Sequence, residues 1–86
     1  MTLVEKTNNR KIKINLKNVT HVKQSENRTI LYFLSRKMQN CNRISDSVFK
    51  DFISDGFLLI NLDNIETIDL RSVNLTNGIT LSLSEQ

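Results

Sequence analysis

Apolar residues in this chain recur at every second position in several short runs, a period that is typical of β-strands. Ile12, Ile14 and Leu16 alternate with polar residues, as in a strand with one buried face and one charged face. Between Arg28 and Ser35 apolar residues point to both sides, which predicts a strand in the middle of a sheet. Proline is absent and glycine occurs only twice, so the chain has no flexible linker. No internal repeat is evident.

One stretch has the spacing of a helix instead. Its apolar stripe predicts a single short helix, formed around Ile44, Val48, Phe49, Phe52 and Ile53. Ser45 would be its N-cap and Gly56 its C-terminal stop. A polar stretch, 36–43, precedes this helix, and strands follow it. The predicted fold class is therefore mostly β, or β-rich α+β, with antiparallel sheets and one short helix.

The dipeptide Asn77-Gly78 marks a β-hairpin whose register follows from the apolar pattern. A two-residue loop would set Leu75 opposite Thr80 and would place the apolar residues of the two strands on different faces. A three-residue loop over 76–78 puts them on one face and leaves Gly78 in a left-handed backbone position, where a side chain is penalised. We therefore predict the three-residue loop with these facing pairs: Leu75 with Ile79, and Val73 with Leu81.

Basic residues are concentrated in the first part of the chain. Residues 1–50 hold eleven Lys and Arg and three acidic residues, a formal charge of +8, whereas residues 51–86 carry −5. A basic surface attracts polyanions, and nucleic acid is the commonest of these. The alternative is that Lys and Arg only solvate exposed strands and protect sheet edges.

Composition argues against several functional classes. A chain of 86 residues forms one domain with a thin core, which we place at residues 11–86, with residues 1–10 as a frayed N-terminus. One His and one Cys cannot assemble a zinc site, and two isolated glycines cannot form a phosphate-binding loop. We expect no enzyme activity, and no catalytic residue, metal, cofactor or small-molecule substrate. The lone cysteine fits a reducing cytoplasm, and no apolar run is long enough to cross a membrane.

Residues 57–68, with the sequence FLLINLDNIETI, resemble the segment of LytTR-type DNA-binding domains in which an aromatic and aliphatic strand ends in Asn. The segments 14–22, 29–34 and 73–84 are similar to other strands of that family, so that the likeness covers residues 11–84. Its most specific part is Asn61 through Ile65. The resemblance implies a LytTR-like fold in which loops between strands enter successive grooves of DNA, usually as paired copies on direct repeats.

The resemblance also indicates which residues would contact DNA. Arg28 would contact a base, because its planar fork can donate two hydrogen bonds to guanine; the alternative is an exposed charge at a strand end. Lys23, Lys37 and Arg43 would neutralise phosphates, which sets affinity without carrying sequence information. Asn27 would either contact adenine or shape the turn before Arg28, and we favour the turn.

Two positions depart from the family pattern. LytTR domains carry a group of the His-Arg-Ser kind just before the aromatic residue of the Asn-terminated strand, where this chain has residues 54–57, Ser-Asp-Gly-Phe. Two explanations are open. The basic site has become acidic, which is the case if Phe52 is aligned with the family's aromatic residue. Alternatively, the site has been deleted, which is what the predicted helix implies. Glu85 stands where the family has a basic residue. If Asp55 and Glu85 are acidic because this surface no longer contacts DNA, both residues should lie at the same end of the molecule as residues 23–28.

Two functions follow from these observations. The first is a bacterial or phage transcription regulator of LytTR type that binds double-stranded DNA in the cytoplasm, alone or as a homodimer. The second is a protein-interaction module, a decoy or inhibitor that pairs with another regulator and has lost base-specific contacts. The acidic residues Asp55 and Glu85 favour the second function. Neither function involves a membrane.

Overall fold

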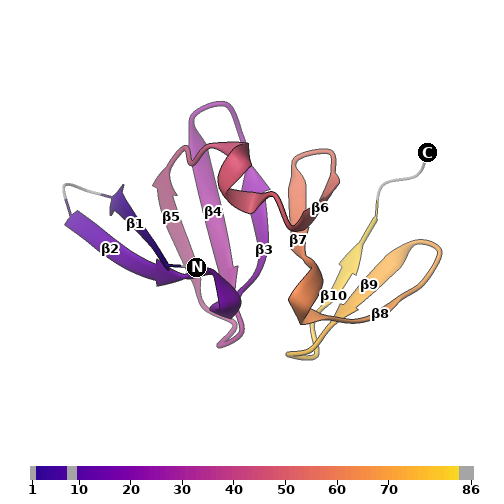
Figure 1. The fold of residues 1–86 in the computed structure, drawn as a ribbon. Helices are drawn as coiled ribbons and strands as arrows, with labels where there is room; N and C mark the ends of the chain where they lie inside the picture. Colours follow the sequence, from indigo (N-terminus) through magenta and orange to yellow (C-terminus); the bar gives the residue numbers. More distant parts are fainter. Residues whose placement is uncertain (1, 8–9, 84–86) are drawn as a thin grey trace.

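The computed structural model describes residues 2–7 and 10–83, with side chains from residue 13 onward. In these residues ten strands form three antiparallel sheets of two, five and three strands (Figure 1). The two-stranded sheet is the hairpin of β1 (Thr2–Thr7) and β2 (Arg10–Asn15). The prediction of a β-rich protein with antiparallel sheets is confirmed, and β4 is an interior strand as expected.

The five-stranded sheet has the strand order β5-β4-β3-β7-β6. Its strands are β3 (Val19–Gln24), β4 (Arg28–Phe33), β5 (Met38–Asn42), β6 (Phe52–Asp55) and β7 (Leu58–Asn61). The three-stranded sheet consists of β8 (Ile65–Ile68), β9 (Ser72–Leu75) and β10 (Thr80–Ser82), with β9 in the middle. Short 3-10 helices join strands at η1 (Leu16–Asn18), η2 (Asp46–Phe49) and η3 (Leu62–Asn64).

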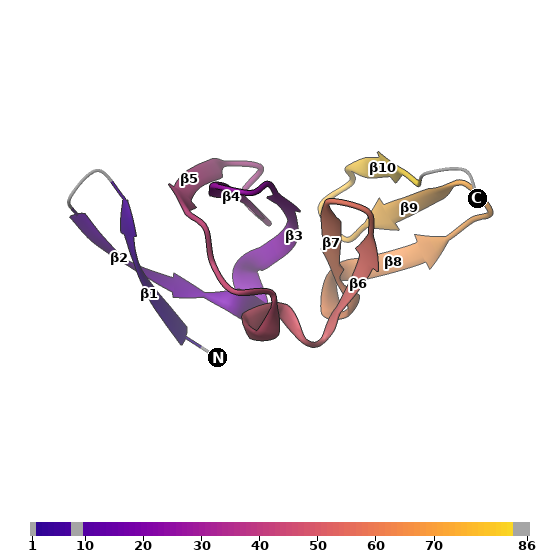
Figure 2. The ribbon, with the colours of Figure 1, turned by 90° about the horizontal axis from the view of Figure 1, so that it is seen from above.

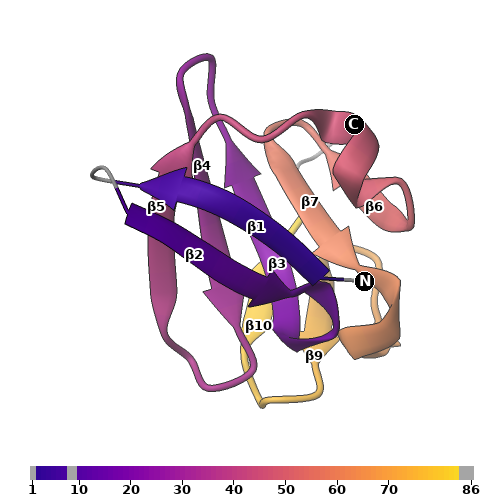
Figure 3. The ribbon, with the colours of Figure 1, turned by 60° about the vertical axis from the view of Figure 1, so that its left-hand side comes forward.

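The three sheets follow one another along the long axis of the molecule (Figure 2), and the β1–β2 hairpin lies across the five-stranded sheet (Figure 3). The first apolar core includes Ile14, Leu16, Val19, Val22, Leu31, Cys41, Ile44, Phe49 and Leu59. The second joins β7 to the three-stranded sheet through Ile60, Val73 and Leu75. Because successive side chains of a strand point to opposite faces, β7 contributes Leu59 to the first core and Ile60 to the second.

The predicted helix is wrong in its extent. Only Asp46–Phe49 forms a 3-10 turn, and the side chain of Ser45 does not cap it. Phe52 and Ile53 belong to β6, because the backbone of this segment pairs with β7 and this pairing outweighs a weak local pattern. Gly56, with φ +63°, lies in the turn between these strands instead of ending a helix. The predicted helix was the reason to infer a deletion relative to the family pattern, and that reason no longer holds.

The predicted register of the last hairpin is confirmed. Val73 pairs with Leu81, and the backbone N–H of Leu75 donates to the carbonyl oxygen of Ile79 over 2.8 Å. Gly78 has a φ of +87°, the left-handed conformation that the three-residue loop requires. The apolar side chains of both strands therefore face the second core.

The structure also reveals an internal repeat, which corrects the view that none is present. Residues 14–22 (INLKNVTHV) and 60–68 (INLDNIETI) share a pattern and a local structure, in which a strand leads through a 3-10 turn into the next strand. In both copies the first Asn side chain accepts a hydrogen bond from the backbone two residues later, Asn15 from Lys17 and Asn61 from Asp63, each over 3.1 Å. The two turns are therefore built in the same way.

Two asparagines of the second copy tie the repeats together. Nδ2 of Asn61 donates to the carbonyl oxygens of Leu16 and Val19 over 3.2 and 2.8 Å. Nδ2 of Asn64 donates to those of Lys17 and Val19 over 3.2 and 3.0 Å. The most specific part of the family resemblance therefore has a structural role at the junction between η1 and η3.

Candidate nucleic-acid interface

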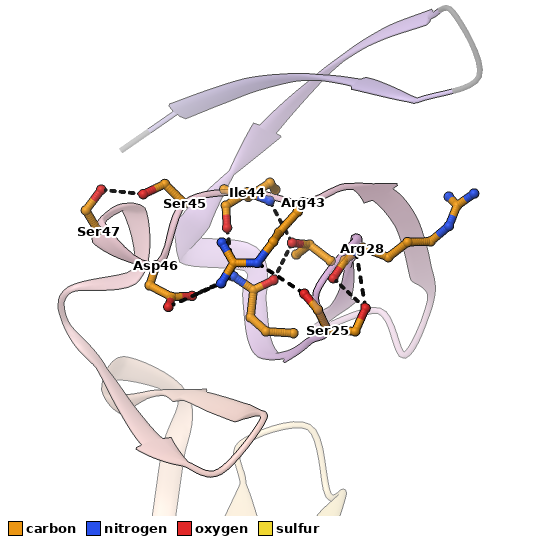
Figure 4. A network of polar contacts seen from close by, with 9 residues as sticks. Ser25, Arg28, Arg43, Ile44, Ser45, Asp46 and Ser47 are labelled. Carbon is orange, nitrogen blue, oxygen red and sulfur yellow. Dashed lines mark hydrogen bonds and ion pairs between the residues drawn. The ribbon is translucent and has the colours of Figure 1, made fainter.

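The turn between β3 and β4 projects from one end of the five-stranded sheet, and we call residues 25–28 the contact loop. The loop is closed by its own hydrogen bonds, because the N–H of Ser25 donates to the Arg28 carbonyl oxygen over 2.9 Å. The N–H of Arg28 donates to Oγ of Ser25 over 3.2 Å. Arg28 is exposed, and its guanidinium extends away from the neighbouring polar groups (Figure 4). Ser25, rather than Asn27, supplies the side chain that shapes the turn.

Lys23 is exposed on β3, next to the contact loop, and its Nζ lies 5.5 Å from the centroid of the Tyr32 ring. That ring stacks on His21 with a centroid distance of 4.3 Å and an angle of 5°. Burial of the imidazole, and then the positive charge of Lys23, lower the pKa of His21 from 6.5 to about 4. His21 is therefore neutral near pH 7, and Lys23 supplies the positive charge at this point of the sheet.

Arg43 reaches the contact loop from the segment after β5. Its Nε donates to the carbonyl oxygen of Ser25 over 3.1 Å, and its Nη2 forms an ion pair with Asp46 at 3.3 Å. Lys37, in contrast, follows the turn after β4, where its carbonyl oxygen accepts a hydrogen bond from Phe33. That turn is at the opposite end of β4 from Arg28. Four of the five predicted residues thus gather at one end, and Lys37 does not.

A buried polar network lies behind the contact loop, and the sequence did not reveal it. Nε2 of Gln24 donates to the Ile44 carbonyl oxygen over 2.8 Å and to Oδ1 of Asp46 over 2.9 Å. Thr29 Oγ1 donates to Oε1 of Gln24 and accepts from the backbone N–H of Ile44. Figure 4 shows how these contacts connect the loop with the start of η2. Gln24 and Thr29 are ordinary polar residues in the sequence, and only their burial distinguishes them.

Asp55 lies at the same end of the molecule as the contact loop, which is the placement that release of this surface from DNA requires, whereas Glu85 lies outside the described residues. The turn after β6 is held beside β3 by a hydrogen bond from the Gln24 N–H to the Phe57 carbonyl oxygen, 2.8 Å long. An open groove of about 860 Å³ is found here, and its lining includes Lys23, Asp55, Phe57, Leu58 and Leu83. Phe57 is 78% exposed, although it was not among the predicted site residues.

Other kinds of site are not found in the described part of the chain. No group of three or more His, Cys, Asp or Glu residues is arranged there to hold a metal ion. Over the same residues, no helix has the length and the apolar character that a membrane span needs.

Comparison with known proteins identifies the fold. No protein-family model and no curated protein matches the sequence. Among solved structures, the chain is similar to the LytTr DNA-binding domain of a methyl-accepting/DNA response regulator from Bacillus cereus. The TM-score is 0.68 at 16% sequence identity, and the match covers 96% of this chain and 85% of that chain. The chain therefore has a LytTR-like fold, as its sequence resemblance implied.

Proposed function

We propose that this chain binds double-stranded DNA through the loops between its strands and acts as a cytoplasmic transcription regulator of LytTR type. The observation that carries the proposal is the coincidence of a LytTr DNA-binding fold with exposed cations, Lys23 and Arg28, at one loop end. All helices of the described residues are 3-10 turns of three or four residues, too short to serve as recognition helices. Loops are therefore the elements that would enter a groove.

Each residue at this end has a distinct role in the proposal. The exposed fork of Arg28 would donate two hydrogen bonds to one guanine in the major groove. Lys23, at the edge of the same surface, would pair with a phosphate and add to affinity without regard to sequence. Asn27 is exposed between them and would be available for an adenine edge. Pairing of two copies, or of this chain with another regulator, on repeated sites would extend the contact along DNA.

A titration against duplex DNA at two salt concentrations tests this function. Phosphate contacts release counterions, so the affinity should fall as the salt concentration rises. Each contact should add about 0.9 to the slope of the logarithm of the binding constant against the logarithm of the salt concentration. Arg28→Ala should cost about 1–3 kcal/mol on the preferred sequence and relax the preference at one base position. Absence of duplex binding at low salt, by protein whose thermal unfolding is normal, would refute the proposal.

We propose one alternative, a protein-interaction module that pairs with an intact regulator. It is favoured by the exposed Phe57 ring, which lies beside Leu58 and Leu83 and next to the acidic Asp55, where LytTR domains carry a basic group. Exposed apolar groups of this kind are typical of protein-binding surfaces. Asp55→Arg separates the two functions. If the chain is an interaction module whose surface no longer contacts DNA, this substitution should raise the affinity for duplex DNA. If the surface is a working DNA-binding surface, the substitution should only weaken the preference for one DNA sequence.

A further inference from the structure

We infer that Arg43 is a positioning residue, which acts with Asp46 and Gln24 to hold the contact loop in its binding shape and does not itself neutralise a DNA phosphate. This role rests on the proposed DNA-binding function and deepens it. It differs from the role that the sequence resemblance suggests for Arg43, and it follows from where the donors of this side chain are directed.

The guanidinium of Arg43 is turned toward the protein. Its Nε donates to the carbonyl oxygen of Ser25, and its Nη2 lies 3.3 and 3.4 Å from the two carboxylate oxygens of Asp46. A planar fork that donates to two fixed acceptors is held in one orientation, which a flexible ammonium group could not reproduce. Asp46 also balances the positive charge, so that Arg43 offers little net attraction to a phosphate.

Asp46 is itself held from the inside of the molecule. The buried Gln24 donates from Nε2 both to Oδ1 of Asp46 and to the carbonyl oxygen of Ile44. Thr29 fixes the other end of the Gln24 amide. Within the described residues, every buried side-chain nitrogen and oxygen has a hydrogen-bond partner. Connected networks of this kind are rigid, so the Asp46 carboxylate is a fixed point to which Arg43 attaches the loop.

The two ends of the loop are thus connected through Ser25. Arg43 holds the carbonyl oxygen of Ser25, while the N–H and Oγ of the same residue bind the backbone of Arg28. The position from which the Arg28 side chain leaves the surface therefore depends on Arg43. A loop that is ordered before binding avoids the entropic cost of ordering upon binding, which is how a positioning residue raises affinity.

Amide hydrogen exchange tests the inference without DNA. In Arg43→Ala, the amides of Ser25 and Arg28 should exchange faster than in the unchanged protein, by roughly tenfold if the loop hydrogen bonds open more often. The amide of Leu75, bonded to Ile79 in the distant hairpin, is the internal control and should not change. Lys17→Ala, an exposed cation at the other end of β3, is the matched variant. Unchanged exchange at Ser25 and Arg28 would overturn the inference.

Duplex binding supplies the second arm of the test. If Arg43 positions the loop, Arg43→Ala should weaken binding roughly threefold to tenfold, the size expected for one or two hydrogen bonds, with the salt slope unchanged. Arg43→Lys keeps the charge but lacks the fork, so it should behave like Arg43→Ala. Asp46→Asn should also weaken binding, whereas Asp51→Asn, the matched loss of an exposed acid, should not.

The opposite pattern would overturn the inference. A phosphate contact predicts that Arg43→Ala lowers the salt slope by about 0.9, that Arg43→Lys restores binding, and that Asp46→Asn strengthens it by releasing Arg43. If the unchanged protein binds no duplex at all, the proposed function fails, and hydrogen exchange alone then decides whether Arg43 holds the loop. Thermal unfolding of each variant separates loop effects from loss of the fold.

Discussion

At the scale of single residues, two turns that each contain a left-handed backbone position contact each other. The turn after β4 contains Arg36, whose φ of 69° is unusual for a residue with a side chain, and the turn before β10 contains Gly78. Nε and Nη2 of Arg36 donate to the carbonyl oxygen of Asn77 over 3.2 and 2.8 Å. These bonds connect the five-stranded sheet with the three-stranded sheet. Nδ2 of Asn77 in turn donates to the carbonyl oxygen of Phe33 over 3.4 Å, so the two turns are joined in both directions.

Gly78→Ala should destabilise the protein by about 1–3 kcal/mol, because it places a side chain in a left-handed conformation. A Cβ at this position would also lie 2.9 Å from Nη2 of Arg36 and would displace the guanidinium from Asn77. Gly56→Ala is the control, since Gly56 has a φ of +63° and no atom near the added Cβ. In urea unfolding, Gly78→Ala should lower the free energy of unfolding more than Gly56→Ala does. This difference between the two variants should vanish when both are made in an Arg36→Ala background. The same excess in both backgrounds would contradict the assigned contact.

His21 should make the stability depend on pH. Its pKa is lowered to about 4 in the folded protein, from 6.5, so between these values the unfolded chain binds a proton that the folded chain does not. The free energy of unfolding should therefore fall as the pH is lowered from 6.5 toward 4. His21 is the only histidine, and His21→Phe keeps a ring against Tyr32 but cannot titrate. Denaturant unfolding of both proteins across this range should show a smaller pH dependence for the variant. Equal dependence would mean that His21 is not buried as a neutral group.

At the scale of elements, the internal repeat provides a matched comparison between two asparagines. Asn64 in η3 is buried and donates to two carbonyl oxygens of the η1 segment, whereas Asn18, its counterpart in η1, is exposed. Asn64→Ala should therefore cost about 1–3 kcal/mol, because it removes both hydrogen bonds that the buried amide donates and leaves the Val19 carbonyl oxygen with only Asn61 as its side-chain donor. Asn18→Ala should change stability by less than about 0.5 kcal/mol. Chemical denaturation measures both, and equal losses would show that the turns are not joined through Asn64.

The elements that could be predicted from the sequence are those whose apolar residues are regularly spaced. The strand from Arg28 was predicted because apolar residues point to both of its sides, and the hairpin around Gly78 because alternation fixes which face is buried. β5 was not predicted, since only Cys41 is fully buried among polar neighbours, and pairing with β4 makes it a strand. β1 was not predicted either. The segment that forms β6 fits both a helix and a strand locally, and only its partner β7 decides between them.

The same limit applies to the candidate site. The resemblance located the contact loop, because strand order and loop position follow the chain. It assigned Lys37 to the same surface, although the predicted strand from Arg28 to Ser35 already puts the length of β4 between Lys37 and Arg28. It also could not show that Arg43 donates to the carbonyl oxygen of Ser25, because this contact forms only when the segment after β5 lies against the contact loop. Contacts between segments are set by tertiary packing, and a local sequence pattern contains little information about that packing.

At the scale of the whole molecule, the uneven charge of the sequence becomes an uneven charge along the long axis. The basic first part of the chain supplies the β1–β2 hairpin and β3 to β5, and the acidic second part supplies β6 to β10 (Figure 1). The molecule measures 40 Å in its longest direction, several times the screening length of about 8 Å at physiological salt. A duplex would therefore be attracted more strongly by the part of the molecule that residues 1–50 form than by the part that residues 51–86 form.

The central claim is that DNA is bound at the contact-loop end, and the most direct test compares two exposed lysines, one near each end of the β3–β4 hairpin. Lys23 lies beside the contact loop and Lys37 follows the far turn. Duplex affinity should be measured over a range of salt for both alanine variants. Lys23→Ala should weaken binding and lower the salt slope by about 0.9, while Lys37→Ala should change neither. Equal effects of the two substitutions, or an effect of Lys37→Ala alone, would contradict the account.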